Sequence, residues 1–202
     1  GRGAARSALL EVHADALAPV RVVYRGGREH SNKAALLWSL GCPVLAFFGA
    51  GVWGFMHTLS SVNYYSHGTQ VTAAHGHLAF FGAYVTLNLA IITYAMPSLR
   101  GLQPYNQVLN MWSFWLMCSG MVFMTVTLTF AGVIQIHMQR VVGGYSFMDV
   151  QDQLALFYWM RLGAGVVFLA GVALFVFPVF GPVREQLTAR SIAADPDLAA
   201  AE

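Results

Sequence analysis

The sequence predicts an all-α integral membrane protein with four transmembrane helices. Hydrophobic residues make up 57% of the 202 residues and charged residues only 10%, and the mean hydropathy is +0.57. Asp, Glu, Lys and Arg are absent from three long stretches, 34–99, 101–139 and 162–183. Because a membrane-spanning helix needs about 20 apolar residues, each stretch has room for one span and the first has room for two.

The helices are expected in order at residues 33–58, 71–96, 106–137 and 152–180. The polar segment SSVNYYSHGTQ (60–70) predicts the turn between the first two. Pro43 has no N–H to donate, which predicts a kink in the first helix. Aromatic residues near the expected helix ends are predicted to anchor the bundle at the membrane interfaces: Trp38, Trp53, Tyr64, Tyr65 and Tyr105.

The basic residues predict how the bundle is oriented. Nine of the eleven Lys and Arg residues lie before or at the start of the first helix, at Arg100 or in the tail, all on one side of the bundle. Cytoplasmic loops carry the excess of positive charge, so both termini are expected in the cytoplasm. Three regions follow: a cytoplasmic segment 1–32, a transmembrane region 33–180 and a cytoplasmic polar tail 181–202.

The start of the chain and its cysteines lead to two smaller expectations. Residue 1 is Gly and the first Met is Met56, so we expect a piece of a longer polypeptide, and the first 32 residues lack the apolar core of a signal peptide. Cys42 and Cys118 fall in the middle of different spans, where free buried thiols are expected.

His75 and His77 are separated by one residue within the second predicted helix. Neighbouring helical residues are about 100° apart, so these two side chains should point to nearly opposite sides and cannot easily share one metal. Two interpretations are open: hydrogen bonds to neighbouring helices, or ligation of two separate haem irons. Gly76 between them would let a bulky partner approach closely, or would serve ordinary helix packing.

Three segments resemble the C-terminal third of the large, cytochrome b subunit of bacterial nitric oxide reductases, in the haem-copper oxidase superfamily. They are FMHTLSSVNYYSHGTQVTAAHGHLAFFGAYVTLNLAIITYAMP (55–97), LTFAGVIQIHMQRV (128–141) and DVQDQLALFYWMRLGAGVV (149–167). The resemblance runs from about residue 32 to 180. It implies that the four helices form the C-terminal part of a subunit I bundle of that superfamily.

The resemblance also implies residue roles. His75 is expected to be the proximal ligand of a high-spin haem b, and His77 a ligand of a low-spin haem b, with Gly76 in contact with the cofactor. The implied reaction reduces NO to N2O at the high-spin haem and a non-haem iron. The implied partners are the remainder of the large subunit, a membrane-anchored cytochrome c subunit and the lipid of a bacterial inner membrane, with no nucleic acid.

Parts of that family's site are not recognisable in the chain. The non-haem iron ligands, the membrane-buried Glu and the second ligand of the low-spin haem are expected on other helices, so the chain alone should lack NO reductase activity. A quinol could replace cytochrome c as electron donor. Two alternatives to the nitric oxide reductase interpretation are a stand-alone membrane cytochrome b that carries electrons, and a fragment of another subunit I of the superfamily.

Five further polar residues have two interpretations each. His57, His67 and His137 lie at helix ends, where an interfacial structural role competes with ligation. Arg161 could be a counter-charge for haem propionates or half of a salt bridge, and Thr58 could line a proton or water path or bond its own helix backbone.

Overall fold

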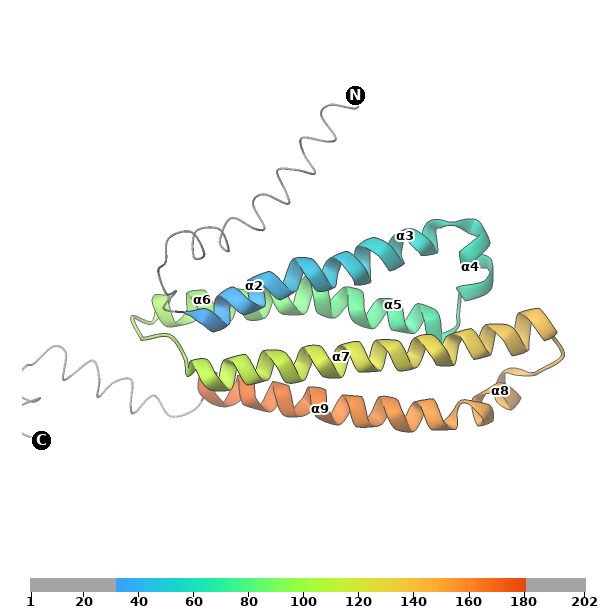
Figure 1. Ribbon diagram of the computed structural model, residues 1–202. Coiled ribbons are helices and arrows are strands. Elements are labelled where there is room, and N and C mark those ends of the chain that lie inside the picture. Colours follow the sequence, from blue (N-terminus) through green and yellow to red (C-terminus); the bar gives the residue numbers. More distant parts are fainter. Residues whose placement is uncertain (1–31, 181–202) are drawn as a thin grey trace, which may run out of the picture.

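A computed structural model describes residues 32–180, which form four long helices running side by side (Figure 1). Each is long and apolar enough to cross a membrane: Lys33–Thr58, Gln70–Leu99, Gln107–Val142 and Ala155–Phe180. No strand occurs between residues 32 and 180. The predicted all-α membrane class is confirmed, and the predicted ends differ from the observed ones by at most five residues.

The first span consists of α2 (Lys33–Ala46), a widened π-helical segment η1 (Phe47–Val52) and α3 (Trp53–Thr58). The Asn32 side chain caps its start by accepting a hydrogen bond from the Ala35 backbone N–H. Pro43 lies inside α2, and the wide turns begin four residues later at Phe47. A π-helical turn shifts the backbone hydrogen bonds by one residue and often marks a functional position.

Residues 60–70, expected to form a turn, contain the short helix α4 (Ser60–Ser66). Leu59 has an extended backbone, which separates α4 from α3 and turns the chain. The Arg140 guanidinium donates hydrogen bonds to the backbone carbonyls of Tyr64, Tyr65 and His67 at the far end of α4. A cation bound to the carbonyls at the C-terminal end of a helix stabilises that end.

The second span consists of α5 (Gln70–Phe80), the π-helical segment η2 (Phe81–Val85) and α6 (Thr86–Leu99). The backbones of the first and second spans are in close contact in two places. A Cβ added to Gly49 would lie 2.6 Å from the carbonyl carbon of Leu78, and one added to Gly82 would lie 2.6 Å from that of Leu45. Small residues permit this approach, so the glycine pair sets the spacing of the two spans.

The third span consists of α7 (Gln107–Ile136) and η3 (His137–Val142), and the fourth is α9 (Ala155–Phe180). The expected start of the fourth helix at residue 152 was three residues early, because Asp152 belongs to a separate short helix, α8 (Phe147–Gln153). Ser146 and Asp149 form a reciprocal capping box that starts α8. The two hydrogen bonds from Ser146 lower the pKa of the Asp149 carboxyl below its usual 3.8.

The interior is lined by aromatic and thioether side chains of the helices. Trp38 packs edge-on against Phe114 of α7 and Phe175 of α9, at ring-centroid distances of 5.0 and 6.0 Å. Trp38 and Tyr105 are buried, with 0% and 2% of their surface exposed, so their predicted role as interfacial anchors is wrong. Their position in the sequence suggested the membrane boundary, but neighbouring helices cover them.

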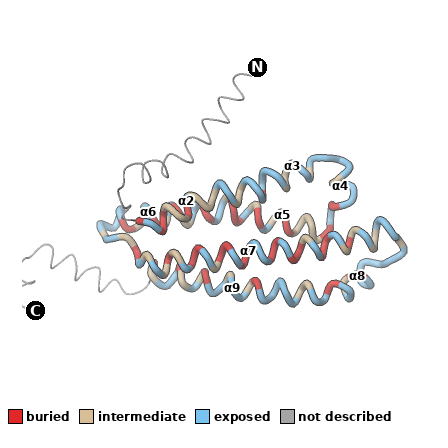
Figure 2. The backbone as a smooth tube through the Cα atoms, viewed as in Figure 1, coloured by how far each residue is buried: buried red, intermediate tan, exposed pale blue. Residues whose placement is uncertain are grey.

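Figure 2 shows the exposed outer faces of the helices in pale blue and the buried inner positions in red. Many of the exposed positions carry large apolar side chains. Tyr64 and Tyr65 are exposed at the α4 end, in keeping with an anchoring role. Cys42 and Cys118 are both free thiols, as expected, but only Cys118 is buried and Cys42 is half-buried. The predicted cytoplasmic segment 1–32, apart from Asn32, and the predicted tail 181–202 lie outside the described residues.

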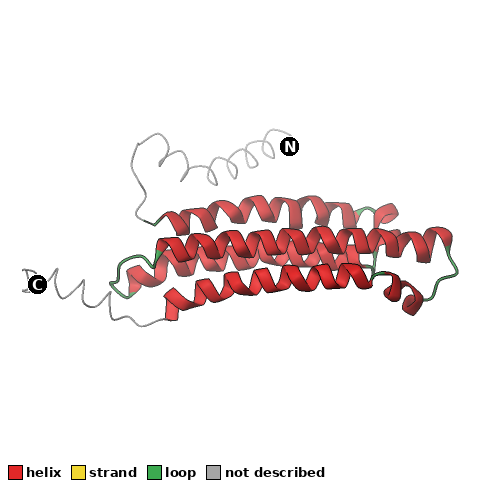
Figure 3. Cartoon of the chain, turned by 60° about the horizontal axis from the view of Figure 1, so that its bottom comes forward, coloured by secondary structure: helices red, strands yellow, loops and turns green. Residues whose placement is uncertain are grey.

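The four spans alternate in direction, with α4 and α8 at one end of the bundle and the α6–α7 connection at the other (Figures 1 and 3). Contacts join the first span to the second, the second to the third, and the third to the fourth along its length. The α7–α9 contact also depends on small residues, since a Cβ on Gly120 would lie 2.9 Å from the Ala164 carbonyl oxygen.

Gly82→Ala should destabilise the protein by about 1–3 kcal/mol, because the added methyl would overlap the α2 backbone. Gly163→Ala is the matched control, since a Cβ there meets no described atom within 4 Å beyond its chain neighbours and its own helix backbone. That variant should be neutral or stabilise by up to about 1 kcal/mol. Thermal unfolding of the purified protein in detergent would measure both, and equal midpoints for the two variants would contradict the close-contact explanation.

Candidate haem-ligating site

His75 points from α5 towards the first span. Its Nδ1 lies 2.9 Å from the Gly49 carbonyl oxygen in η1. A carbonyl can only accept, so Nδ1 carries the proton and Nε2 keeps its lone pair. The glycine contact between the spans brings the Gly49 carbonyl to this distance, and η1 presents it towards α5. His75 therefore has one nitrogen fixed by the backbone and the other available to a metal.

The ring of His57 stacks on the ring of His75. Their centroids are 4.8 Å apart and their planes differ by 22°. The His57 Nδ1 donates to the Trp53 carbonyl of its own helix at 2.8 Å. Its Nε2 is buried and has no hydrogen-bond partner in the described part of the chain. The sequence placed His57 beside the outer turn but gave no sign of this ring contact.

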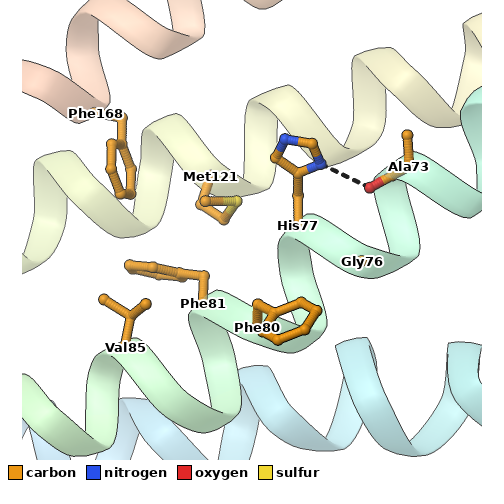
Figure 4. Close-up of a pocket in the computed structure, with 8 residues that line it drawn as sticks. All are labelled: Ala73, Gly76, His77, Phe80, Phe81, Val85, Met121 and Phe168. Atoms are coloured by element: carbon orange, nitrogen blue, oxygen red, sulfur yellow. Dashed lines mark hydrogen bonds between the residues drawn. The ribbon is translucent and has the colours of Figure 1, made fainter.

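His77 faces a different set of helices. Its Nδ1 donates to the Ala73 carbonyl at 2.7 Å, one turn earlier in α5, and its side chain is exposed. The ring borders a groove of about 450 Å³ with mostly apolar walls. In Figure 4, His77 and Phe81 project from the second span towards Met121 of α7, with Phe168 of α9 beside them. Again Nδ1 is held by a backbone carbonyl and Nε2 is free.

Gly76 has space beside it. A Cβ built at this position would meet no described atom within 4 Å beyond its chain neighbours and its own helix backbone, whereas one at Gly49, Gly82, Gly120 or Gly132 would clash with a neighbouring helix. Gly76 also lines the groove next to His77. Helix packing among the described residues therefore does not explain this glycine.

These residues suit haem iron better than a compact metal centre. An imidazole that binds iron through Nε2 usually donates its Nδ1–H to a carbonyl or carboxylate, which fixes the ring and strengthens the ligand. Both His75 and His77 have that arrangement. No group of three or more His, Cys, Asp or Glu side chains that could hold a metal occurs among the residues described. The apolar groove beside His77 suits a porphyrin face.

The remaining candidate residues lie away from this groove. His67 and His137 have exposed side chains, and the backbone of His67 binds Arg140. Thr58 donates to the Phe55 carbonyl at 2.7 Å, which is the backbone-bonding interpretation. Arg161 is exposed on α9 and has no ion pair or hydrogen bond within residues 32–180.

Sequence reasoning missed three contributors to the site: the Gly49 carbonyl, the His57 ring and the groove wall made by Met121 and Phe168. The Gly49-Ala-Gly51 run after Pro43 was a signal for close helix approach. No local pattern marks Met121 or Phe168, because each is one apolar residue among many in its span.

Comparison with known proteins places the chain in a family. Residues 16–167 match the family described as cytochrome c and quinol oxidase polypeptide I. The chain is 53% identical to a nitric oxide reductase subunit of Stutzerimonas stutzeri over 165 residues, which cover 78% of the chain and 35% of the relative. It is 31% identical to a cytochrome c oxidase subunit 1 homolog of Agrobacterium tumefaciens, over 78% of the chain and 31% of the relative.

A solved structure of a heme-copper terminal oxidase dimer shares the fold. The TM-score is 0.63 at 19% sequence identity, and the match covers 77% of this chain and 28% of that one. The chain spans about a third of the length of the curated relatives that it matches. On the strength of the four-helix fold and these matches, the chain belongs to the cytochrome c and quinol oxidase polypeptide I family and resembles part of the nitric oxide reductase subunit of Stutzerimonas stutzeri.

Proposed function

We propose that this chain is the haem-ligating C-terminal portion of a nitric oxide reductase catalytic subunit. His75 would be the proximal ligand of a high-spin haem b and His77 one of two ligands of a low-spin haem b. The complete subunit would convert two NO, two electrons and two protons into N2O and water, with a non-haem iron held by its other helices. The observation that carries this proposal is the pair of imidazoles with free Nε2 atoms that face different neighbours.

The chain's residues have separate tasks in this scheme. Bound haem would supply electron transfer at the His77 side and a binding position for NO at the His75 side. The carbonyls of Gly49 and Ala73 hold the two rings in the Nδ1–H tautomer and make each Nε2 a stronger electron donor. Phe81, Met121 and Phe168 provide apolar contact area for a flat ring and exclude water from it.

The ring stack argues against a stand-alone electron carrier that would use His57 and His75 on one iron. Two axial imidazoles on one haem lie on opposite faces of the porphyrin. Rings that stack with centroids 4.8 Å apart leave no room for a porphyrin between them. The other alternative, a fragment of another subunit I, is less favoured by sequence identity. The chain is 53% identical to the nitric oxide reductase subunit and 31% identical to the cytochrome c oxidase subunit 1 homolog.

Localisation and partners follow from the same proposal. The four spans would lie in a bacterial inner membrane, with both termini in the cytoplasm and α4 and α8 on the outer side. The remainder of the large subunit would cover exposed apolar faces of the bundle. Electrons would arrive from a membrane-anchored cytochrome c subunit and enter at the low-spin haem.

Substituting each histidine in the complete subunit should affect a different haem. His75→Ala should abolish NO turnover but leave the low-spin bis-imidazole spectrum, because the ring that faces Gly49 would be lost. His77→Ala should erase the low-spin signal and stop electron delivery, but leave a ferrous high-spin haem that binds CO. Optical and EPR spectra, with a haem-to-protein ratio for each variant, would measure the effects. Full haem content and unchanged spectra in both variants would refute the two-haem assignment.

Gly76→Ala should lower the haem content of the complete subunit without weakening the fold. The new methyl meets no described atom within 4 Å, so thermal unfolding before haem is added should match that of Gly163→Ala. A porphyrin beside His77 would need that space, so haem should bind at least tenfold more weakly, a loss of about 1.4 kcal/mol. Normal haem content in the variant would show that the cofactor does not occupy the space beside Gly76.

Topology can be tested with a cysteine at Ser61, which is exposed on α4. An impermeant maleimide should label it in intact spheroplasts, because the proposed arrangement puts α4 outside. A cysteine at Gly101, exposed between α6 and α7, should react only after the cells are opened. The parent chain, which contains only the native Cys42 and Cys118, measures the background labelling. The reverse labelling pattern would invert the topology.

A further inference from the structure

We propose that His57 is a positioning residue that fixes the plane of the His75 imidazole. The inference rests on the proposed function, because it concerns how His75 presents Nε2 to an iron. The side chain that packs on the face of the His75 ring is His57. It belongs to α3 in the first span and not to α5, which carries His75.

One hydrogen bond cannot hold the ring in place. The terminal torsion of a histidine side chain is broad, so the ring turns easily unless neighbours restrain it. The Gly49 carbonyl fixes the position of Nδ1 but still permits the ring to swing about that contact. A flat ring against its face, 4.8 Å between centroids and only 22° from parallel, removes this remaining freedom. Gly54 of α3 faces the ring edge, where a Cβ built on it would come into ordinary contact, 3.6 Å from Cε1 of His75.

His57 is itself held rigidly enough to act as a support. Its Nδ1 donates to the Trp53 carbonyl at 2.8 Å, a bond within α3 that sets the rotation of the ring. The opposite nitrogen, Nε2, is buried and lacks a hydrogen-bond partner in the described part of the chain. An unpaired buried polar atom costs stability, so apolar packing alone would favour Leu at this position. The restrained flat ring is what His57 adds.

The plane of an axial imidazole affects the iron–nitrogen bond that it makes. The iron–histidine stretching band of the ferrous high-spin haem, seen by resonance Raman spectroscopy, therefore reports on ring orientation separately from turnover. The complete subunit with its haems would be compared as wild type, His57→Leu, His57→Phe and His67→Leu. Leu removes the ring, and Phe keeps a flat ring of similar size. His67 is an exposed histidine on the same side of the bundle and serves as the matched control.

We expect His57→Leu to shift or broaden the band, His57→Phe to restore its wild-type frequency, and His67→Leu to leave it unchanged. The low-spin haem spectrum should be the same in all four proteins. If His57→Leu fails to retain the high-spin haem, retention with a wild-type band in His57→Phe supports the proposal, and loss in both overturns it. An unchanged band in His57→Leu, a Phe variant that behaves like Leu, or an equal effect of His67→Leu also overturns it.

His75→Ala separates this inference from the proposed function. If that variant loses the band while His57→Leu keeps it, His75 is the ligand and only the positioning role fails. If His75→Ala keeps the band, the ligand assignment fails and the positioning role of His57 fails with it.

Discussion

The backbone contact between the first two spans determines the geometry of the candidate site. Gly49 lies against the backbone of Leu78 and Ala79, and Gly82 lies against that of Leu45 and Ala46. Larger residues at either position would move the spans apart. The Gly49 carbonyl would then be out of reach of the His75 Nδ1, and the stack between His57 and His75 would open. The pairing of the helices and the preparation of the ligand therefore depend on the same two glycines.

The two histidines have unequal surroundings. His75 is half-buried and restrained by the Gly49 carbonyl and the stacked His57 ring. His77 is exposed beside an apolar groove and is held only by the Ala73 carbonyl of its own helix. A ligand restrained by both a hydrogen bond and a stacked ring suits the iron at which chemistry takes place, where bond geometry matters most. The freer ring suits an electron-transfer haem whose second ligand lies elsewhere.

The bundle satisfies most of its polar groups locally. Most Ser and Thr hydroxyls in the spans donate to carbonyls one turn earlier, as Thr86 does to Gly82 and Thr127 does to Phe123. Where the chain leaves the helices, Arg140 binds three carbonyls at the end of α4. Side chains that pair locally keep polar groups away from lipid and leave the helix faces free for packing. The Nε2 of His57 is one of eight buried side-chain polar atoms that have no hydrogen-bond partner within residues 32–180.

Local sequence is enough to predict the four spans and the different directions of His75 and His77. A run of about 20 apolar residues predicts a span, and a two-residue separation on a helix fixes an angle. What each ring meets depends on the tertiary structure: the Gly49 carbonyl and His57 at one, Met121 and Phe168 across a groove from the other. The tertiary structure also decides that Trp38 lies in the core. It likewise places Arg140 where it can bind the short helix at residues 60–66. These features depend on which helices become neighbours, and an apolar residue in a span carries no local mark of the helix that it will contact.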